Sequence, residues 1–153
     1  TRCSRDWSSD VCSSDLTVVN SKDVLRARDA GAQFIVSPNT DEEVIGETKR
    51  AGLISLPGVA TPSEVAAAKK YGADILKLFP ASTFGPGHLK ALRDPFPGNF
   101  WCPTGGLSAD SVGEWFAAGA NIVGVGGPLI KGGMDAIESN VKAFLEAVAK
   151  ARG

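Results

Sequence analysis

A repeated pattern, glycine followed by a short apolar run, constrains the fold of this chain more than any other feature. Four segments carry it closely, and 97–103 fits it more loosely: AGAQFIV (30–36), AGLISL (51–56), YGADILKL (71–78) and AGANIVGV (118–125). The glycines recur every 20 to 26 residues: Gly31, Gly52, Gly72, Gly98 and Gly119. Each follows a helix-like stretch, where a left-handed residue commonly ends a helix. Each apolar run has the length of a strand that is covered on both faces.

Helix start signals lie between the apolar runs. The segments TDEE at 40–43 and TPSE at 61–64 predict capping boxes, the second with proline at the first helical position. Ser21 and Ser108 are expected to open two more helices, and an apolar stripe over 137–148 predicts a C-terminal helix. Strands that alternate with helices at this period indicate βα units and a parallel sheet.

The apolar runs predict six strands: 16–19, 34–37, 53–57, 74–79, 99–103 and 121–126. A doubly wound open sheet accepts six strands, but its first turn usually carries a dinucleotide-type glycine fingerprint that is absent here. A (β/α)8 barrel needs two more units, roughly 45 residues at this period. Because the only methionine is Met134, we expect residues upstream. The sequence therefore predicts an α/β fold, a (β/α)8 TIM barrel with about the first two βα units missing.

The first sixteen residues, TRCSRDWSSDVCSSDL, do not follow the repeat. Five are serine and three are aspartate, and no helical or strand period runs through them. Two cysteines nine residues apart, with no histidine nearby, do not form a zinc signature, and no apolar run suggests a secretory signal. We interpret 1–16 as an unrelated leader, translated sequencing-adapter DNA, with a disordered polar tail as the alternative. Residues 17–153 are then strands 3 to 8 and the C-terminal helix of the barrel.

Charge and composition exclude several classes of function. With 16 basic and 17 acidic residues the formal charge is −1, which argues against nucleic acid as a partner. No apolar stretch approaches the roughly 18 residues of a membrane span. The only histidine, His88, is expected at the surface, and no ligand set for a metal is present. Cys102 is expected to be a buried small hydrophobe, and Lys131 part of a solvated face.

One lysine lies where a lysine is unusual. In the run Asp74–Pro80, Lys77 is flanked on both faces of the predicted strand by apolar residues. Desolvation favours the neutral amine, which can attack a carbonyl carbon to form a Schiff base. Lys77 also lies at the C-terminal end of its strand, where barrel enzymes hold their active sites. The alternative is a lysine that extends to solvent from a strand edge.

Two glycine-rich turns follow the last two predicted strands. They are Pro103–Gly106 and Gly124–Gly127. In a barrel that lacks its first two strands, these would be the loops after strands 7 and 8, which often bind phosphate through backbone N–H groups. Either turn alone is weak evidence, since glycine-rich turns are common.

Six segments together resemble one enzyme family, in the family's order: FIVSPN (34–39), SLPGVATPSE (55–64), KLFPA (77–81), DPFPG (94–98), WCPTGG (101–106) and VGVGGPL (123–129). They are similar to the 2-keto-3-deoxy-6-phosphogluconate aldolases, a group that includes the 4-hydroxy-2-oxoglutarate and phosphogalactonate enzymes. The resemblance runs from Thr17 to the C-terminus. It implies a trimeric, cytoplasmic (β/α)8 class I aldolase that cleaves a keto acid to pyruvate and an aldehyde without a cofactor.

The resemblance also assigns roles to residues. The Schiff-base lysine of the family's K-x-F-P motif corresponds to Lys77. The remaining positions correspond to residues that contact the pyruvate portion, wall the site, or face the substrate carboxylate and phosphate: Thr17, Pro38, Phe79, Thr104, Gly105, Gly106, Gly126 and Gly127.

Three departures from the family pattern bear on function. The family's acid/base glutamate and carboxylate-binding arginine come from an E-x-x-x-R strand that 1–16 does not contain, so we expect this chain to be nearly inactive. Ser14-Asp15-Leu16 replaces the family's G-A-G. Pro128 replaces a phosphate-binding serine, which leaves a non-phosphorylated substrate possible. The alternative functions are a sugar-phosphate isomerase or epimerase barrel and a non-catalytic barrel fragment.

Overall fold

The computed structural model describes residues 17–153, so the interpretation of 1–16 as a leader lies outside the described part of the chain. The chain divides into two compact units. The first contains the described residues up to Val59 together with Ser63–Leu76, and the second contains Ala60–Pro62 and Lys77–Gly153. The division between Leu76 and Lys77 lies within a single strand.

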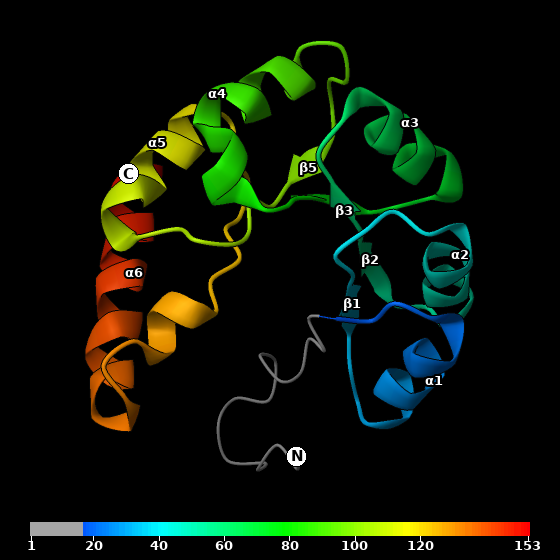
Figure 1. Ribbon diagram of the computed structural model, residues 1–153, viewed down its shortest axis with the longest axis horizontal. Coiled ribbons are helices and arrows are strands. Elements are labelled where there is room, and N and C mark those ends of the chain that lie inside the picture. The colour runs from blue at the N-terminus through cyan, green and yellow to red at the C-terminus, as the bar shows by residue number, and fades with distance from the viewer. Residues whose placement is uncertain (1–16) are drawn as a thin grey trace. The chain divides into compact units, whose positions relative to one another are not determined.

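The first unit alternates strands and helices, as the glycine repeat predicts. Strands β1 and β2 pair in parallel, with Ile35 opposite Ser55. Helices α1 and α2 pack against each other and lie on one side of this strand pair (Figure 1). A short strand, β3, which the sequence did not predict, neighbours β4. The elements are α1 (Ser21–Asp29), β1 (Phe34–Val36), α2 (Glu42–Arg50), β2 (Ile54–Leu56), β3 (Gly58–Val59), α3 (Pro62–Tyr71) and the first half of β4 (Ile75–Leu78).

The core of the first unit is aliphatic. Its buried members come from α1, β1, α2 and the segments beside them: Val18, Val24, Ala32, Ile35, Val44 and Leu53. Burial of such side chains stabilises the unit by about 1.5–3 kcal/mol each.

The second unit begins with the second half of β4, which neighbours β5. Its C-terminal helix α6 packs against α5 and against the short helix η3 (Figure 1). Trp101 and Trp115 are almost fully buried, as expected for core residues. The elements are α4 (Ala81–Arg93), β5 (Phe100–Trp101), η2 (Ala109–Ser111), α5 (Val112–Ala117), η3 (Gly127–Ile130), η4 (Met134–Ala136) and α6 (Ile137–Arg152).

Two of the six predicted strands are wrong. The described part of 16–19 is not a strand, although the Val18 N–H donates to the Val36 carbonyl at 3.2 Å. The run 121–126 forms a single parallel bridge, between Thr104 and Gly124, before η3 begins. An apolar run alone does not make a strand, because a strand also needs a partner along its length.

The helix start signals were correct in position and partly wrong in detail. Helix α3 begins at Pro62 as predicted. The cap of α2, however, is Asp41, whose side chain accepts from the Val44 N–H at 2.9 Å. Thr40 instead donates its hydroxyl hydrogen to the Gly58 carbonyl at 2.8 Å. Aspartate and threonine can both cap a helix. Because the Thr40 hydroxyl is bonded to β3, Asp41 caps α2.

All five repeat glycines adopt positive φ angles, between 74° and 97°. Four of these glycines come one or two residues after a helix, as predicted, whereas Gly98 lies five residues after α4 ends at Arg93. Within residues 17–153, no helix is long and apolar enough to cross a membrane. The same residues hold no cluster of three or more side chains that could bind a metal ion.

Candidate active site

Lys77 lies near the end of β4 and is only 3% exposed. Its ammonium nitrogen is 4.5 Å from the centroid of the Phe79 ring. Burial lowers the pKa of Lys77 from its ordinary value of 10.5, because an ammonium loses its hydration there, while the charge of Cys102 partly opposes this change. No ion pair joins Lys77 to a carboxylate in the described part of the chain. The neutral form of the Lys77 amine is therefore more favoured in this site than it would be in water.

Cys102 is the ionisable neighbour of this lysine. It is 5% exposed, and its Sγ atom lies 3.6 Å from the Thr104 Oγ1 atom. Burial raises the pKa of the Cys102 thiol, and both the Thr104 hydrogen bond and the charge of Lys77 oppose that shift. Each group therefore favours the charged form of the other, although burial has the larger effect on both. The burial of Cys102 agrees with the sequence prediction.

The first glycine turn is held between β4 and α4. The Thr104 N–H donates to the Leu78 carbonyl at 3.0 Å, which continues the strand pairing. The first N–H groups of α4 then bind the turn, because Ala81 donates to the Thr104 carbonyl at 2.8 Å and Ser82 to the Gly105 carbonyl at 3.0 Å. These bonds satisfy helix donors that have no intrahelical partner.

The two glycines of this turn have no room for side chains. Gly105 and Gly106 have φ angles of 98° and 74°. A Cβ atom on Gly105 would lie 3.2 Å from the Phe79 ring, and one on Gly106 would lie 2.5 Å from the Ser82 hydroxyl oxygen. The turn therefore packs tightly on Phe79, the residue whose ring contacts Lys77.

The second glycine turn lies beside the first. Gly124 forms its bridge with Thr104, and its N–H donates to the Pro103 carbonyl at 2.9 Å. Gly126 precedes η3 and accepts from the Leu129 N–H at 2.9 Å, and Gly127 is the first residue of η3. The structure thus brings both predicted turns together, although the second does not end a regular strand.

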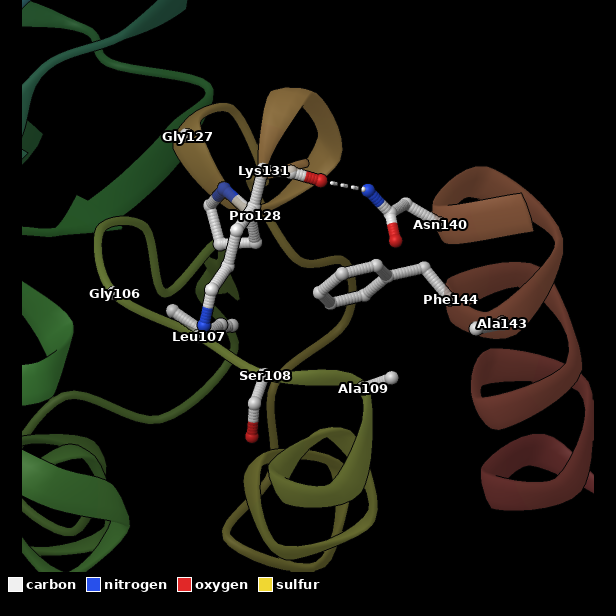
Figure 2. A pocket seen from close by; sticks show the side chains of 10 residues that line it. All are labelled: Gly106, Leu107, Ser108, Ala109, Gly127, Pro128, Lys131, Asn140, Ala143 and Phe144. Atoms are coloured by element: carbon white, nitrogen blue, oxygen red, sulfur yellow. Dashed lines mark hydrogen bonds between the residues drawn. The ribbon is translucent and has the colours of Figure 1, made fainter. Parts of the chain in front are cut away.

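A cavity of about 610 Å³ lies at these two turns. Figure 2 shows side chains from the first turn, from η3 and from α6 around it. The lining residues are Gly106, Leu107, Ser108, Ala109, Gly127, Pro128, Lys131, Asn140, Ala143 and Phe144. Lys131 is exposed, as expected, and the sequence did not single out Ser108 or Asn140 as site residues. Ser108 follows the first turn directly in sequence, whereas Asn140 reaches the glycine turns because α6 packs against η3.

Two predicted site residues belong to the first unit. Thr17 is exposed and precedes Val18, whose backbone pairs with Val36. Pro38 follows β1, and its carbonyl lies where a Cβ atom of Gly58 would be. Both residues therefore lie near the C-terminal end of β1.

His88 is not a simple surface residue, contrary to expectation. Its Nε2 atom is 2.7 Å from the Ala60 carbonyl oxygen, and its ring stacks on Phe84 with centroids 4.7 Å apart. The residue is half-buried and links α4 to the segment before α3. These contacts describe a structural role.

Comparisons with known proteins agree with the residues described above. The family model of KDPG and KHG aldolases matches residues 2–147. A probable 2-dehydro-3-deoxy-6-phosphogalactonate aldolase of Rhizobium meliloti (strain 1021) is 37% identical over 129 residues, 84% of this chain and 61% of the relative. The chain thus spans less than two thirds of that relative's length.

Solved structures of similar proteins share the fold. A native KDPGal structure has a TM-score of 0.84 and 33% identity, covering 88% of this chain and 67% of the other. A KDPG aldolase from Legionella pneumophila, with pyruvate captured as a covalent carbinolamine, has a TM-score of 0.70 and 29% identity, covering 86% and 63%. The α/β fold with parallel strands, the order of the motifs and the family match agree. The chain belongs to the KDPG and KHG aldolase family.

Proposed function

We propose that the protein is a class I aldolase that uses Lys77 as its Schiff-base residue. Its substrate is a 2-keto-3-deoxy-6-phospho sugar acid or 4-hydroxy-2-oxoglutarate, and its products are pyruvate and an aldehyde. The observation that carries this proposal is the buried Lys77 at the end of β4, with a lowered pKa and no carboxylate partner in the described part of the chain. A neutral amine in such a place is a nucleophile for a ketone.

The proposed reaction follows from amine chemistry. The Lys77 nitrogen bonds to the ketone carbon of the substrate and forms a carbinolamine, which loses water to give an iminium ion. As the C4 hydroxyl gives up its proton to a base, the electron pair of the C3–C4 bond moves toward the iminium, which leaves an enamine and releases the aldehyde. Protonation of the enamine at C3 and addition of water release pyruvate and restore the amine. The carbinolamine captured in the Legionella relative supports this sequence.

The other predicted site residues would surround this chemistry. Phe79 packs beside the Lys77 nitrogen, and Thr104, Gly105 and Gly106 form the turn on the Phe79 ring. Gly126 and Gly127, at the start of η3, would form the second half of an anion-binding region. Thr17 and Pro38 remain predictions that rest on the family resemblance.

Borohydride trapping with pyruvate tests the Schiff base. Sodium borohydride reduces the iminium to a stable amine, so we expect a reduced pyruvate adduct that peptide mass mapping locates at Lys77. Lys77→Arg keeps the positive charge and should abolish the adduct. The exposed Lys90→Arg should retain it. A wild-type chain that gives no adduct at Lys77 would overturn the proposal and favour an isomerase or a non-catalytic barrel.

We propose that this chain traps pyruvate well but cleaves the substrate slowly. A general acid/base contributes roughly 10²–10⁴ in rate, and no carboxylate lines the cavity or pairs with Lys77 in residues 17–153. Cleavage is measured from pyruvate release. A rate near that of a full-length relative, measured side by side, would contradict this proposal.

The assembly and setting of the whole protein are proposed from the family resemblance. We propose a (β/α)8 barrel to which the described strands contribute, and a homotrimer. We also propose a cytoplasmic enzyme of sugar-acid breakdown, with the keto acid as its only small-molecule partner.

A further inference from the structure

Lys77 and Cys102 lie opposite each other on neighbouring strands. Strand β5 neighbours β4, and beyond the end of β5 the Thr104 N–H donates to the Leu78 carbonyl at 3.0 Å. The Ala81 N–H then donates to the Thr104 carbonyl at 2.8 Å, so the two segments run in the same direction. In a parallel pair with these bonds, Cys102 stands in register with Lys77, one strand spacing of about 4.8 Å away.

Both side chains lie on the same buried face. Residues in register on parallel strands share a face of the sheet, and the contacts agree with this arrangement. The Lys77 nitrogen lies 4.5 Å from the centroid of the Phe79 ring, and the Cys102 Sγ atom lies 3.6 Å from the Thr104 Oγ1 atom. The exposed fractions of Lys77 and Cys102 are 3% and 5%. An amine and a thiol therefore share one site that bulk water scarcely reaches.

The other ionisable groups near β4 are engaged elsewhere. The Asp74 carboxylate pairs with a lysine of α2. On α4, His88 lies against a backbone carbonyl, Arg93 donates to another, and Lys90 is exposed. Strand β3 and the segment 121–126 carry no titratable side chain. Among the charged groups of residues 17–153, Cys102 is the one that affects the pKa of the β4 lysine.

The proposed reaction places a new positive charge in this site. Burial favours the neutral Lys77 amine, but the Schiff base that reacts is a cationic iminium. A buried cation is unfavourable unless an anion lies near it. The keto acid brings its own carboxylate. From the described part of the protein, the group that can ionise beside the nitrogen is the Cys102 thiol.

We infer that Cys102 is the counter-ion of the iminium at Lys77, and that its thiol loses its proton as the Schiff base forms. The amine nitrogen bonds to the ketone carbon, and the carbinolamine then loses its hydroxyl group as water. The proton that this water requires comes from the Cys102 sulfur, so that amine, thiol and ketone become iminium, thiolate and water. The inference rests on the proposed function and deepens it, because it names a residue that stabilises the intermediate.

Proton counting during Schiff-base formation tests the inference. Pyruvate is mixed with the protein in weak buffer near pH 7, an indicator dye reports the protons released or taken up, and borohydride trapping gives the amount of adduct. Cys102→Ser keeps the size of the side chain but removes the acid. This variant should release fewer protons than the wild type, or take up more, by about one proton per adduct. The difference does not depend on how far Lys77 is protonated beforehand, because both proteins contain that lysine.

Two further variants separate charge from packing. Cys102→Ala also removes the acid and should give the same proton difference, so it decides the question if the serine variant does not fold. Both variants should need roughly tenfold more pyruvate for half-maximal adduct, the effect of one lost charged interaction. Val112→Ala shortens a fully buried side chain of α5 and should keep the proton count of the wild type.

The ultraviolet absorbance of the thiolate gives an independent readout. Saturating pyruvate should raise this absorbance in the wild type, and subtraction of the Cys102→Ser spectrum removes the signal of the other two cysteines and of pyruvate. Lys77→Met cannot form the iminium and should show no rise. An equal rise in Lys77→Met would mean that the thiol ionises without the iminium, which would overturn the inference.

The inference and the proposed function fail in different ways. If wild-type protein gives no adduct at Lys77, there is no iminium to balance, and both are wrong. If the adduct forms but wild type and Cys102→Ser have equal proton counts, the aldolase proposal stands and Cys102 is not the counter-ion. An adduct together with the proton difference and the thiolate signal supports both, and the loss of either signal overturns the counter-ion.

Discussion

Lys77 links the protonation of one residue to the stability of the fold. The pKa of Lys77 is lower in the folded chain than its ordinary value of 10.5, which applies to the unfolded chain. At pH values between the two, Lys77 is mostly protonated in the unfolded chain and mostly neutral in the folded chain. The free energy of unfolding therefore rises with pH across this window, and the cost of burying the charge is greatest below it. We expect Lys77→Met to raise stability, most strongly at the lowest pH, and to remove this slope.

Urea unfolding between pH 6 and 10 measures the effect of Lys77→Met. The exposed Lys90→Met on α4 is the control, because it removes a lysine without removing a buried charge. An equal pH slope in wild-type and Lys77→Met protein would show that this lysine is not the linked group.

Gly106 is a second residue whose role is steric. An alanine there would place its Cβ against the Ser82 side chain and would hold a φ of 74° that alanine avoids. We expect Gly106→Ala to lower stability by roughly 1–3 kcal/mol. Ser82→Gly in the same chain should recover part of this loss, since it removes the clash but not the backbone strain.

Chemical denaturation of the single and double variants checks the prediction for Gly106. Gly87→Ala, in a helical position of α4 with open space around its Cβ, should instead stabilise by about 0.5–1 kcal/mol. If Gly106→Ala is as stable as wild type, then the turn does not pack on α4 as described.

At the level of elements, α2 depends on Asp41 for its start. Its carboxylate accepts from the Val44 N–H and also lies beside the unpaired N–H groups of the first helical turn. We expect Asp41→Ala to destabilise the protein by about 0.5–2 kcal/mol, and Asp41→Asn by much less. Thermal unfolding of both variants measures this difference. If the alanine and asparagine variants were equally stable, the side-chain cap would be unimportant.

The predicted strand 121–126 shows where local pattern fails. Its apolar residues fit a strand as well as those of β4 do, yet the segment contains Gly124 and Gly126 and is followed directly by Gly127. Glycine weakens a strand and allows the backbone to leave the sheet. After one bridge to Thr104 the chain turns into η3. Because the chain leaves the sheet after this bridge, Gly127 and Pro128 lie at the cavity.

The whole molecule is expected to associate. Several large apolar side chains are exposed in the described part of the chain, among them Phe100, Ile130, Met134 and Leu145. Exposed apolar surface often marks a contact between subunits, and the family resemblance implies a trimer. For the full-length protein we expect light scattering coupled to size exclusion to give about three times the mass of one chain. A single species at one chain mass at micromolar concentration would contradict the trimer.

The sequence by itself determined the alternation of strands and helices, the glycines that end the helices and the buried lysine at a strand end. These features are local, because periodicity, caps and positive φ angles depend on residues close together in the chain. It also indicated the family, since the motifs around Lys77 and the two glycine turns are local as well.

Only the tertiary structure decided which of these features meet. Asp41 caps α2 and Thr40 does not, because Thr40 bonds to β3. The tertiary structure also places Lys131, Ser108 and Asn140 around one cavity. It also made Cys102 a neighbour of Lys77 whose charge partly opposes the effect of burial on the pKa of the lysine. Such pairings depend on how α6 packs against η3 and how β4 lies beside β5, contacts between segments far apart in the chain. Neither residue spacing nor composition carries that information, because packing is set by the fit of whole elements.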